Sequence, residues 1–242
     1  MPFSSPPGFR SDIEKFQQKI KNKEKFAFSK YADGELHILA NQKINNGEFW
    51  FNPDTDQFYR QKLIESFTHN EDGYYMGISC PCCIGGTQAH EFMKRTCNKT
   101  EDKLTWANLF VNSNYDFYLD SIVPLYSEYE VYLVSNDESN LKSLPFKVAK
   151  HFKIGKNAWN SDYHLAEEMI QFISDGEIKD GLFLFGAGPF GNILAAELHK
   201  ASKENTYIDI GSTLKPFLLG EKGKNRGYLR ASPGSGNSCR WS

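Results

Sequence analysis

Short apolar runs alternate with amphipathic segments along most of this chain. The apolar runs have the length of buried strands, which we expect at residues 25–30, 74–79, 131–134, 182–185 and 207–210. Residues 146–154 alternate between apolar and polar positions, which predicts a further strand. Between them, apolar residues recur at helical spacing, which predicts helices at residues 11–22, 54–67, 87–97, 115–125, 165–173 and 191–202. Strands without polar alternation, separated by helices, are typical of a parallel sheet covered on both faces. The pattern therefore predicts an α/β fold with a Rossmann-like, mostly parallel sheet.

The two ends of the chain depart from this pattern. Residues 1–10 are expected to form a flexible lead-in, and residues 220–242, which are rich in Gly, Ser, Lys and Arg, a loop-like tail. Ser11 and Glu14 have the spacing of a capping box, which predicts that the first helix begins at Ser11. With 242 residues, we expect a single domain spanning residues 1–242.

Composition excludes several classes of partner. A formal net charge of −2 gives no basic excess that would favour nucleic acid. No apolar run reaches the length of a membrane span, and the N-terminal residues lack the pattern of a signal peptide. An odd cysteine count of five without that signal predicts a cytoplasmic protein.

Three of the five cysteines lie together in Cys80-Pro81-Cys82-Cys83. This spacing raises the possibility of a zinc site, but His90 and Cys97 do not form a second clean ligand pair. We favour loop thiols over a structural zinc from the sequence alone.

The first candidate site follows the strand expected at residues 25–30. Asp33 and Glu35 flank Gly34, which leaves a tight turn free to adopt a positive φ. Two acids at the end of a strand are suited to a hard divalent cation, with substrate phosphates as further ligands. The alternative is a polar turn in which the helix dipole favours Glu35. From the tripeptide alone, the polar turn is favoured, because Asp-Gly is a common turn.

The second candidate site follows the strand expected at residues 182–185. Gly186-Ala187-Gly188-Pro189-Phe190-Gly191 matches G-x-G-x-x-G, and Asp209 lies 18 residues after Gly191. In this layout the glycines admit a diphosphate to the backbone, the helix N-terminus donates N–H groups and the acid holds a ribose. We favour phosphate binding over a ligand-free turn. Pro189 and the late position of the motif argue against a dehydrogenase.

Together these segments resemble the GT-D class of glycosyltransferases. Tyr31-Ala32-Asp33-Gly34-Glu35 is similar to the (F/Y)-G-D-G-E segment of that class, whose D-x-E motif matches Asp33 and Glu35. The resemblance covers roughly residues 25–215, although Ala32 replaces the usual Gly and no Arg follows the mid-chain Asn. The other similar segments, in the same order, are residues 106–110, 157–159, 186–198 and 207–211.

The resemblance implies a metal-dependent hexosyltransferase of glycan biosynthesis with a GT-D-type fold. It would move a sugar from a nucleotide-diphosphate sugar, with a UDP-sugar favoured, to a hydroxyl of a glycan or glycoconjugate. Asp33 and Glu35 would hold Mn²⁺ or Mg²⁺, and Asp33, Glu35 and Asp209 would be catalytic. The donor-binding residues would be Lys30, Tyr31, Asn108, Gly186, Ala187, Gly188, Asp209 and Arg226. The candidates for the base are Asp209, Asp137, His37 and His164.

Two other functions stay open. The glycine turn could serve an NAD- or S-adenosylmethionine-dependent enzyme, in which Asp33 and Glu35 would be dispensable. Alternatively, the chain could be a non-catalytic domain that binds a nucleotide or a sugar. The sequence does not determine the sugar, the nucleotide, the acceptor, the stereochemical outcome or the oligomeric state.

Overall fold

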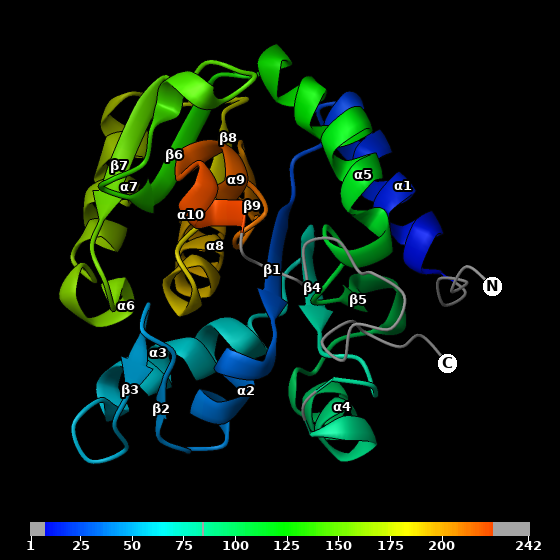
Figure 1. Ribbon diagram of the computed structural model, residues 1–242, viewed down its shortest axis with the longest axis vertical. Helices are drawn as coiled ribbons and strands as arrows, with labels where there is room; N and C mark the ends of the chain where they lie inside the picture. Colours follow the sequence, from blue (N-terminus) through cyan, green and yellow to red (C-terminus); the bar gives the residue numbers. More distant parts are fainter. Residues whose placement is uncertain (1–7, 84, 225–242) are drawn as a thin grey trace.

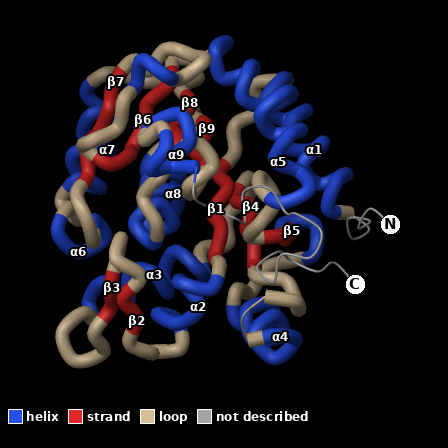
Figure 2. The backbone as a smooth tube through the Cα atoms, in the orientation of Figure 1, coloured by secondary structure: helices blue, strands red, loops and turns tan. Residues whose placement is uncertain are grey.

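A parallel sheet of seven strands forms the centre of the computed structural model, which describes residues 8–83 and 85–224. The strand order is β5-β4-β1-β9-β8-β6-β7, and each adjacent pair is parallel (Figures 1 and 2). This confirms the predicted α/β fold. The strands are β1 (Ala27–Tyr31), β4 (Tyr74–Ile78), β5 (Leu104–Trp106), β6 (Val131–Asn136), β7 (Lys150–Ile154), β8 (Leu182–Phe185) and β9 (Thr206–Asp209).

Helices cover both faces of the sheet (Figure 1). One face carries α2 (Asp33–Leu39), α3 (Gln57–Thr68), α4 (Gly86–Thr96), α6 (Ala158–Ser161), α7 (Leu165–Asp175) and α8 (Pro189–Ala201). The other carries α1 (Phe9–Lys21), α5 (Tyr115–Phe117), the π turn Tyr118–Ile122, the 3₁₀ turn Val123–Glu128 and α9 (Lys215–Leu218). The remaining elements are the hairpin β2 (Ile44–Asn45) and β3 (Trp50–Phe51), the helix α10 (Glu221–Lys224) and three 3₁₀ turns, Glu101–Lys103, Asn112–Asn114 and Leu141–Ser143.

Burial on both faces explains why the central strands are continuous apolar runs. In β8, Phe183 and Phe185 belong to the core under α8, whereas Leu182 and Leu184 belong to the core under α1 and α5. All four side chains are fully buried. Successive strand residues point to opposite faces, so a polar residue at any of these positions would lie in one core or the other.

The boundaries of several elements differ from the predicted ones. Helix α1 begins at Phe9 after Gly8, which has a φ of +96°, so the predicted capping box at Ser11 is wrong. The helix includes residues 9 and 10 of the predicted lead-in, whose residues 1–7 lie outside the described residues. Ser11 lies inside the helix, where its hydroxyl donates to Gly8 O over 3.1 Å. The strand expected from residue 146 begins at Lys150. Glu221–Lys224 is helical within the predicted tail, whose residues 225–242 lie outside the described residues.

The sheet brings the ends of β1, β9 and β8 to one edge. From β1 the chain continues to β4 and β5 on one side, whereas β6, β7 and β8 stand on the other side of β9. The strand order thus reverses beside β1 and β9. In open α/β sheets, ligands bind outside the carboxyl ends of the strands at such a reversal.

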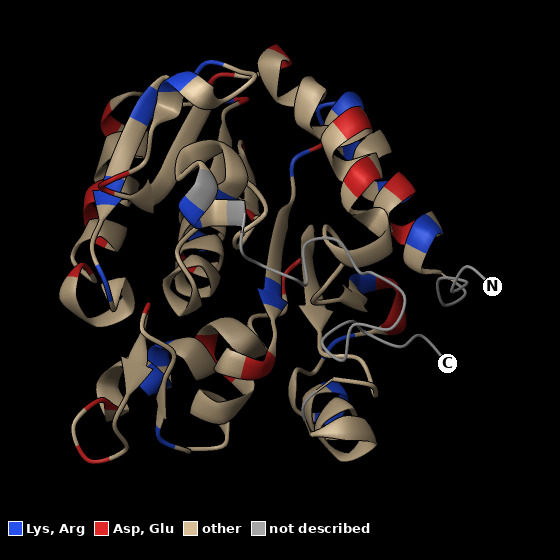
Figure 3. Ribbon diagram, in the orientation of Figure 1, with Lys and Arg blue, Asp and Glu red and all other residues tan. Residues whose placement is uncertain are grey.

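Charged side chains of both signs are spread over the helices, and α1 carries Lys and Arg as well as Asp and Glu along its length (Figure 3). Among the described residues, no helix combines the length and apolar character needed to span a membrane.

Candidate functional site

The first corner of the site is the junction of β1 and α2. The helix begins at Asp33 directly after Ala32, and Glu35 caps it by accepting the Ala32 N–H at Oε2 over 2.9 Å. Gly34 lies within the helix and has no positive φ, so the conformational freedom of glycine is not used there. Glycine is required there for space instead, because a Cβ on Gly34 would lie 2.6 Å from Cζ of Phe49.

The two acids of this corner have different environments. Asp33 is exposed, whereas Glu35 is only 6 % exposed. Residues two apart on a helix do not face each other. Asp33 therefore presents its carboxylate to solvent, while Glu35 points inward and holds the start of α2.

The second corner is the glycine turn between β8 and α8. Gly188 precedes the helix with a φ of +56°, which favours glycine, and Pro189 opens the helix. A Cβ on Gly186 would lie 3.2 Å from Gly211 O, and one on Gly191 would lie 3.3 Å from Asp209 Oδ1. The glycines thus let the turn pack closely against the end of β9. The residues 186–188 are half-buried at the same edge of the sheet.

Asp209 ends β9 and points inward between the two corners. It is 1 % exposed, and its Oδ1 accepts the Gly211 N–H over 2.9 Å. Its Oδ2 accepts the Lys30 N–H over 3.4 Å. Burial raises the pKa of Asp209, and the Lys30 ammonium opposes this shift. A carboxylate in this position supports the local backbone.

Lys30, Glu35 and Asp209 form one electrostatic cluster. Burial raises the pKa of Glu35, Lys30 lowers it and Asp209 raises it further, so the three charges act on one another. The Lys30 side chain extends over the end of β9, where a Cβ on Gly211 would lie 2.7 Å from Nζ. With both acids ionised, this acid–lysine cluster keeps one uncompensated negative charge. The cluster joins segments that are far apart in the sequence, since Lys30 and Asp209 are separated by 179 residues.

Two further residues complete the edge, and sequence reasoning missed both. Asn192 in α8 is fully buried and donates through Nδ2 to Lys30 O (2.6 Å) and Ser29 Oγ (2.9 Å). Its Oδ1 has no hydrogen-bond partner among the described residues. Phe49, in the β2–β3 hairpin, packs its ring against Gly34 and Gly188 and so bridges the two corners. A polar residue in the apolar α8 was the available signal for Asn192; none pointed to Phe49.

The remaining predicted donor-binding residues are Tyr31, Asn108, Ala187 and Arg226. The Tyr31 side chain is fully buried, with its hydroxyl 2.8 Å from Ser66 Oγ, so it offers no surface to a donor. Asn108 directs its amide to Cys83 Sγ over 3.6 Å. Ala187 is half-buried within the glycine turn. Arg226 lies outside the described residues.

The remaining candidate bases lie at the surface. Asp137 is exposed just after β6, at the carboxyl edge of the sheet. His37 Nδ1 is 2.9 Å from Gln42 Oε1, and His164 Nε2 is 3.8 Å from Glu168 Oε1. Of these, Asp137 is the one that follows a strand directly.

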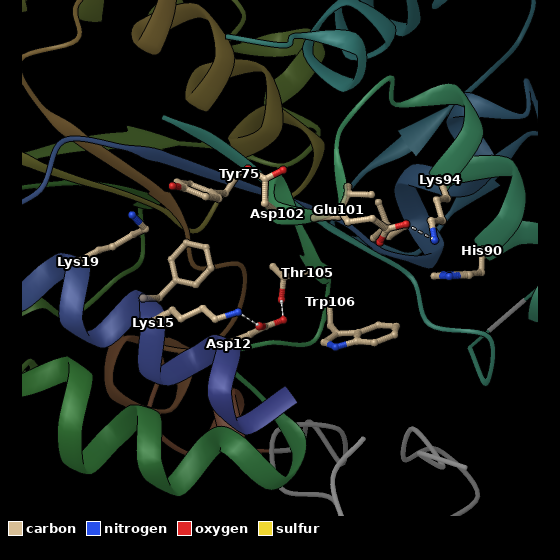
Figure 4. Close-up of a pocket in the computed structure, with 13 residues that line it drawn as sticks. Asp12, Lys15, Lys19, Tyr75, His90, Lys94, Glu101, Asp102, Thr105 and Trp106 are labelled. Carbon is tan, nitrogen blue, oxygen red and sulfur yellow. Dashed lines mark hydrogen bonds and ion pairs between the residues drawn. The ribbon is translucent and has the colours of Figure 1, made fainter. Parts of the chain in front are cut away.

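A cavity of about 320 Å³ lies along the edge strand β5 (Figure 4). Trp106 and His90, whose rings stack with centroids 6.0 Å apart, line it together with Tyr75. On the α1 side, Asp12 accepts from Thr105 Oγ1 over 2.9 Å and pairs with Lys15 over 3.0 Å. The cavity is separate from the acid–lysine cluster, because β4 stands between β5 and β1.

Two solved structures share this architecture over most of the chain. One is described as a selenomethionine-substituted structure of domain of unknown function 1792; it matches with a TM-score of 0.55 and 15% identity, over 82% of this chain and 76% of that one. The other is described as a highly conserved domain of unknown function 1792 with a distinct glycosyltransferase fold; it matches with a TM-score of 0.54 and 15% identity, over 81% and 75%. This chain has a glycosyltransferase fold.

The glycosyltransferase fold agrees with the architecture that the GT-D resemblance implied. At 15% identity the likeness concerns the fold alone. No protein-family model matches the chain, and no curated protein matches it. The D-x-E motif and the roles of its residues stay predictions.

Proposed function

We propose that this chain is a glycosyltransferase that moves a sugar from a nucleotide-diphosphate sugar, with a UDP-sugar favoured, to a hydroxyl of a glycan or glycoconjugate. The observation that carries the proposal is the convergence of Lys30, the Asp33–Glu35 corner and the glycine turn at one edge of a glycosyltransferase fold. This edge lies at the strand-order reversal, where α/β sheets bind ligands.

The chemistry requires stabilisation of the departing nucleoside diphosphate, which gains negative charge as the glycosidic bond breaks. Lys30 supplies an ammonium beside that position, and the backbone of residues 187 and 188 supplies N–H groups at the start of α8, whereas the Gly186 N–H donates to Val134 O. Glu35 and Asp209 interact electrostatically with Lys30, so we assign them as positioning residues. Asp137, exposed after β6, is the favoured base for the acceptor hydroxyl.

The residues at this edge of the sheet fit a divalent cation whose ligands would come mainly from the phosphates of the donor. Mg²⁺ is commonly bound by one or two carboxylates together with substrate phosphates, and Asp33 presents an exposed carboxylate at this edge. Glu35, which caps α2, supports Asp33 from within the same turn. When bound, Mn²⁺ or Mg²⁺ would act as a Lewis acid on the leaving diphosphate.

For the acceptor, we propose the cavity beside β5. Trp106 pairs with Ile78 in the sheet, and Ile78 pairs with Tyr31 at the end of β1. Adjacent strands are about 4.8 Å apart, so the Trp106 end lies roughly 10 Å from the β1–α2 corner. An aromatic ring with flanking polar groups suits a sugar, which has both apolar and hydroxyl surfaces.

The test is a donor screen followed by variants of the edge. UDP-sugars and other nucleotide-sugars, NAD and S-adenosylmethionine are compared by thermal shift with and without Mn²⁺, because a ligand of the folded state raises the melting temperature. The best donor is then assayed for hydrolysis and transfer. We expect a metal-dependent shift with one nucleotide-sugar, and loss of turnover in Asp33→Asn at an unchanged melting temperature.

Glu167→Gln is the matched control for Asp33→Asn, because Glu167 is also an exposed acid in the first turn of a helix. It should keep full turnover. A metal-independent shift with NAD or S-adenosylmethionine, or full turnover in Asp33→Asn, would contradict the proposal. Binding of a nucleotide-sugar without hydrolysis or transfer would instead indicate a non-catalytic binding domain.

A further inference from the structure

Three cysteine sulfurs lie together in the loop that follows β4. Cys80 Sγ is 2.6 Å from Cys82 Sγ and 3.2 Å from Cys83 Sγ, and all three sulfurs lie within 4.8 Å of one another. The turn that gathers them is closed by a hydrogen bond from Cys83 N–H to Cys80 O over 3.0 Å. The three cysteines among residues 80–83 therefore direct their thiols to a common point.

The number and type of these groups favour a soft metal ion. Thiolate sulfur is the preferred ligand of Zn²⁺ and Cu⁺ in proteins, whereas Mg²⁺ and Mn²⁺ prefer oxygen. A disulfide would join only two of the three sulfurs and leave the third in contact with it. A single ion at bond lengths of about 2.3 Å engages all three.

The surroundings of the thiols support the same reading. Cys80 is 3 % exposed, which fixes one ligand in the protein, whereas Cys82 is exposed and gives an ion a path of entry. Asn108 Nδ2 donates to Cys83 Sγ over 3.6 Å, a contact that stabilises sulfur carrying negative charge. The donor binding predicted for Asn108 stays a separate prediction.

We propose that Cys80, Cys82 and Cys83 bind one Zn²⁺ ion, with the fourth position left to a small exchangeable ligand. Each thiol loses its proton on binding, so up to three protons are released per ion. The thiols form a site distinct from the acid–lysine cluster, and the proposal does not depend on sugar transfer.

The ion would fasten this loop beside the first corner of the edge. Ser79 Oγ, just before the thiols, donates to Tyr31 O at the end of β1 over 3.4 Å. Beyond them, a Cβ on Gly85 would lie 3.3 Å from Leu36 Cδ2 in α2. A metal site in this loop therefore stabilises contacts on both sides of the β1–α2 junction.

The experiment measures metal content and metal spectra of the full chain. The protein is purified under reduction without chelator, its zinc is quantified, and the metal-free protein is titrated with Co²⁺, which absorbs by thiolate charge transfer when sulfur binds it. We expect one zinc per chain, thiolate charge transfer with Co²⁺ and a raised melting temperature when zinc is restored. Cys82→Ser, at an exposed position, should weaken zinc binding at least tenfold and reduce the charge-transfer intensity.

Cys97→Ser is the matched control. Cys97 is buried after α4 and its thiol donates to Lys94 O over 3.4 Å, outside the group of three sulfurs. It should leave the zinc affinity unchanged. A chain that takes up no zinc and gives no cobalt–thiolate absorption, one that binds only Cu⁺, or equal losses in both variants would overturn the proposal. So would reduced protein that forms a Cys80–Cys82 disulfide in air at the same rate with and without zinc.

Discussion

At the amino ends of the strands, His69 and His199 lie buried against each other, with Nε2 and Nδ1 3.2 Å apart. Burial lowers the pKa of His69 to about 4 and that of His199 to about 3. At the carboxyl ends, burial raises the pKa of Glu35 and of Asp209, and Lys30 partly reverses both shifts. Both ends of the sheet thus bury ionisable groups. Burial favours the neutral form of all four groups, but at the carboxyl end the Lys30 ammonium favours the charged form of the two acids.

The difference separates a cluster whose groups are satisfied by one another from the cluster that we propose as the active site. His69, Glu71 and His199 have ligand atoms within 4.8 Å of one another, which is close enough for a metal. However, Lys203 lies 3.0 Å from His199 Nδ1 and pairs with Glu71, so a cation already occupies this place. The neutral imidazoles are satisfied by their neighbours. At the carboxyl end, the half-buried Lys30 lies at the strand-order reversal, where we propose that an anionic donor binds.

Replacing Lys30 by methionine is the strongest test of this contrast. We expect Lys30→Met to lower transfer by about 100-fold or more, because removing one group that stabilises transition-state charge commonly costs that much. The same change leaves Glu35 and Asp209 without their cation and raises their pKa values further. A raised pKa in the folded state means stability that is present at low pH and lost as pH rises through that pKa.

Lys30→Met should therefore be less stable than the parent chain at pH 7, with the deficit shrinking as the pH falls toward 5. Urea unfolding at both pH values and a steady-state transfer assay measure the two effects. Lys153→Met, at an exposed position of β7, is the control and should change neither. Full transfer activity in Lys30→Met would contradict the proposed role of Lys30 in transfer.

The amino end should respond to pH in the opposite sense. For a histidine whose pKa is depressed in the folded state, stability is full above the unfolded value of 6.5 and is lost as pH falls through the folded values of about 4 and about 3. We expect a loss on the order of 2 kcal/mol for each histidine between pH 7 and pH 4.5. Urea midpoints across this range measure it. His199→Gln should flatten the curve, whereas His164→Gln at an exposed position should not; identical curves would contradict the prediction.

The sequence predicted the layers of this fold better than their boundaries. Leu182–Phe185 is recognisable as a central strand because burial on both faces removes every polar position. The start of α1 is not recognisable in the sequence. Gly8 precedes the helix through its backbone conformation, whereas Ser11 and Glu14 have the spacing of a side-chain cap that does not form. Local patterns report burial well and report backbone geometry only where side chains take part in it.

The sequence also predicted the two strand-to-helix corners, but not that they lie side by side in the sheet. Asp33, Glu35 and Asp209 stand out as acids after apolar runs. That Lys30 joins Glu35 to Asp209 depends on the pairing of β1 with β9, which no local pattern encodes. Likewise, the steric need for glycine at position 34 follows only from the tertiary structure, which places the Phe49 ring against Gly34.

A smaller effect is expected from Gly188→Ala. Gly188 has a φ of +56°, and an added Cβ would lie 3.2 Å from Cδ1 of Phe49. We expect a loss of about 1–3 kcal/mol from the backbone strain, together with displacement of the ring that bridges the two corners. Gly47→Ala is the control, because its φ is +83° but nothing lies within 4 Å of an added Cβ. Chemical denaturation and donor KM should separate the two; a KM raised equally in both would show that Phe49 does not matter to the donor.

The smallest effect concerns the ion pair that ties the β2–β3 hairpin across the edge. Lys215 Nζ lies 2.5 Å from Glu48 Oε1, with side chains 19 % and 47 % exposed. Exposed pairs contribute about 0.2–1 kcal/mol and weaken with salt. A double-mutant cycle of Glu48→Gln and Lys215→Met should give a coupling energy in that range at low salt and less at high salt. Because Phe49 follows Glu48, losing the pair should raise the donor KM a few-fold while kcat stays unchanged. A fall in kcat with an unchanged KM would show that the hairpin affects the chemical step. It would then contradict the assignment of transition-state stabilisation to Lys30.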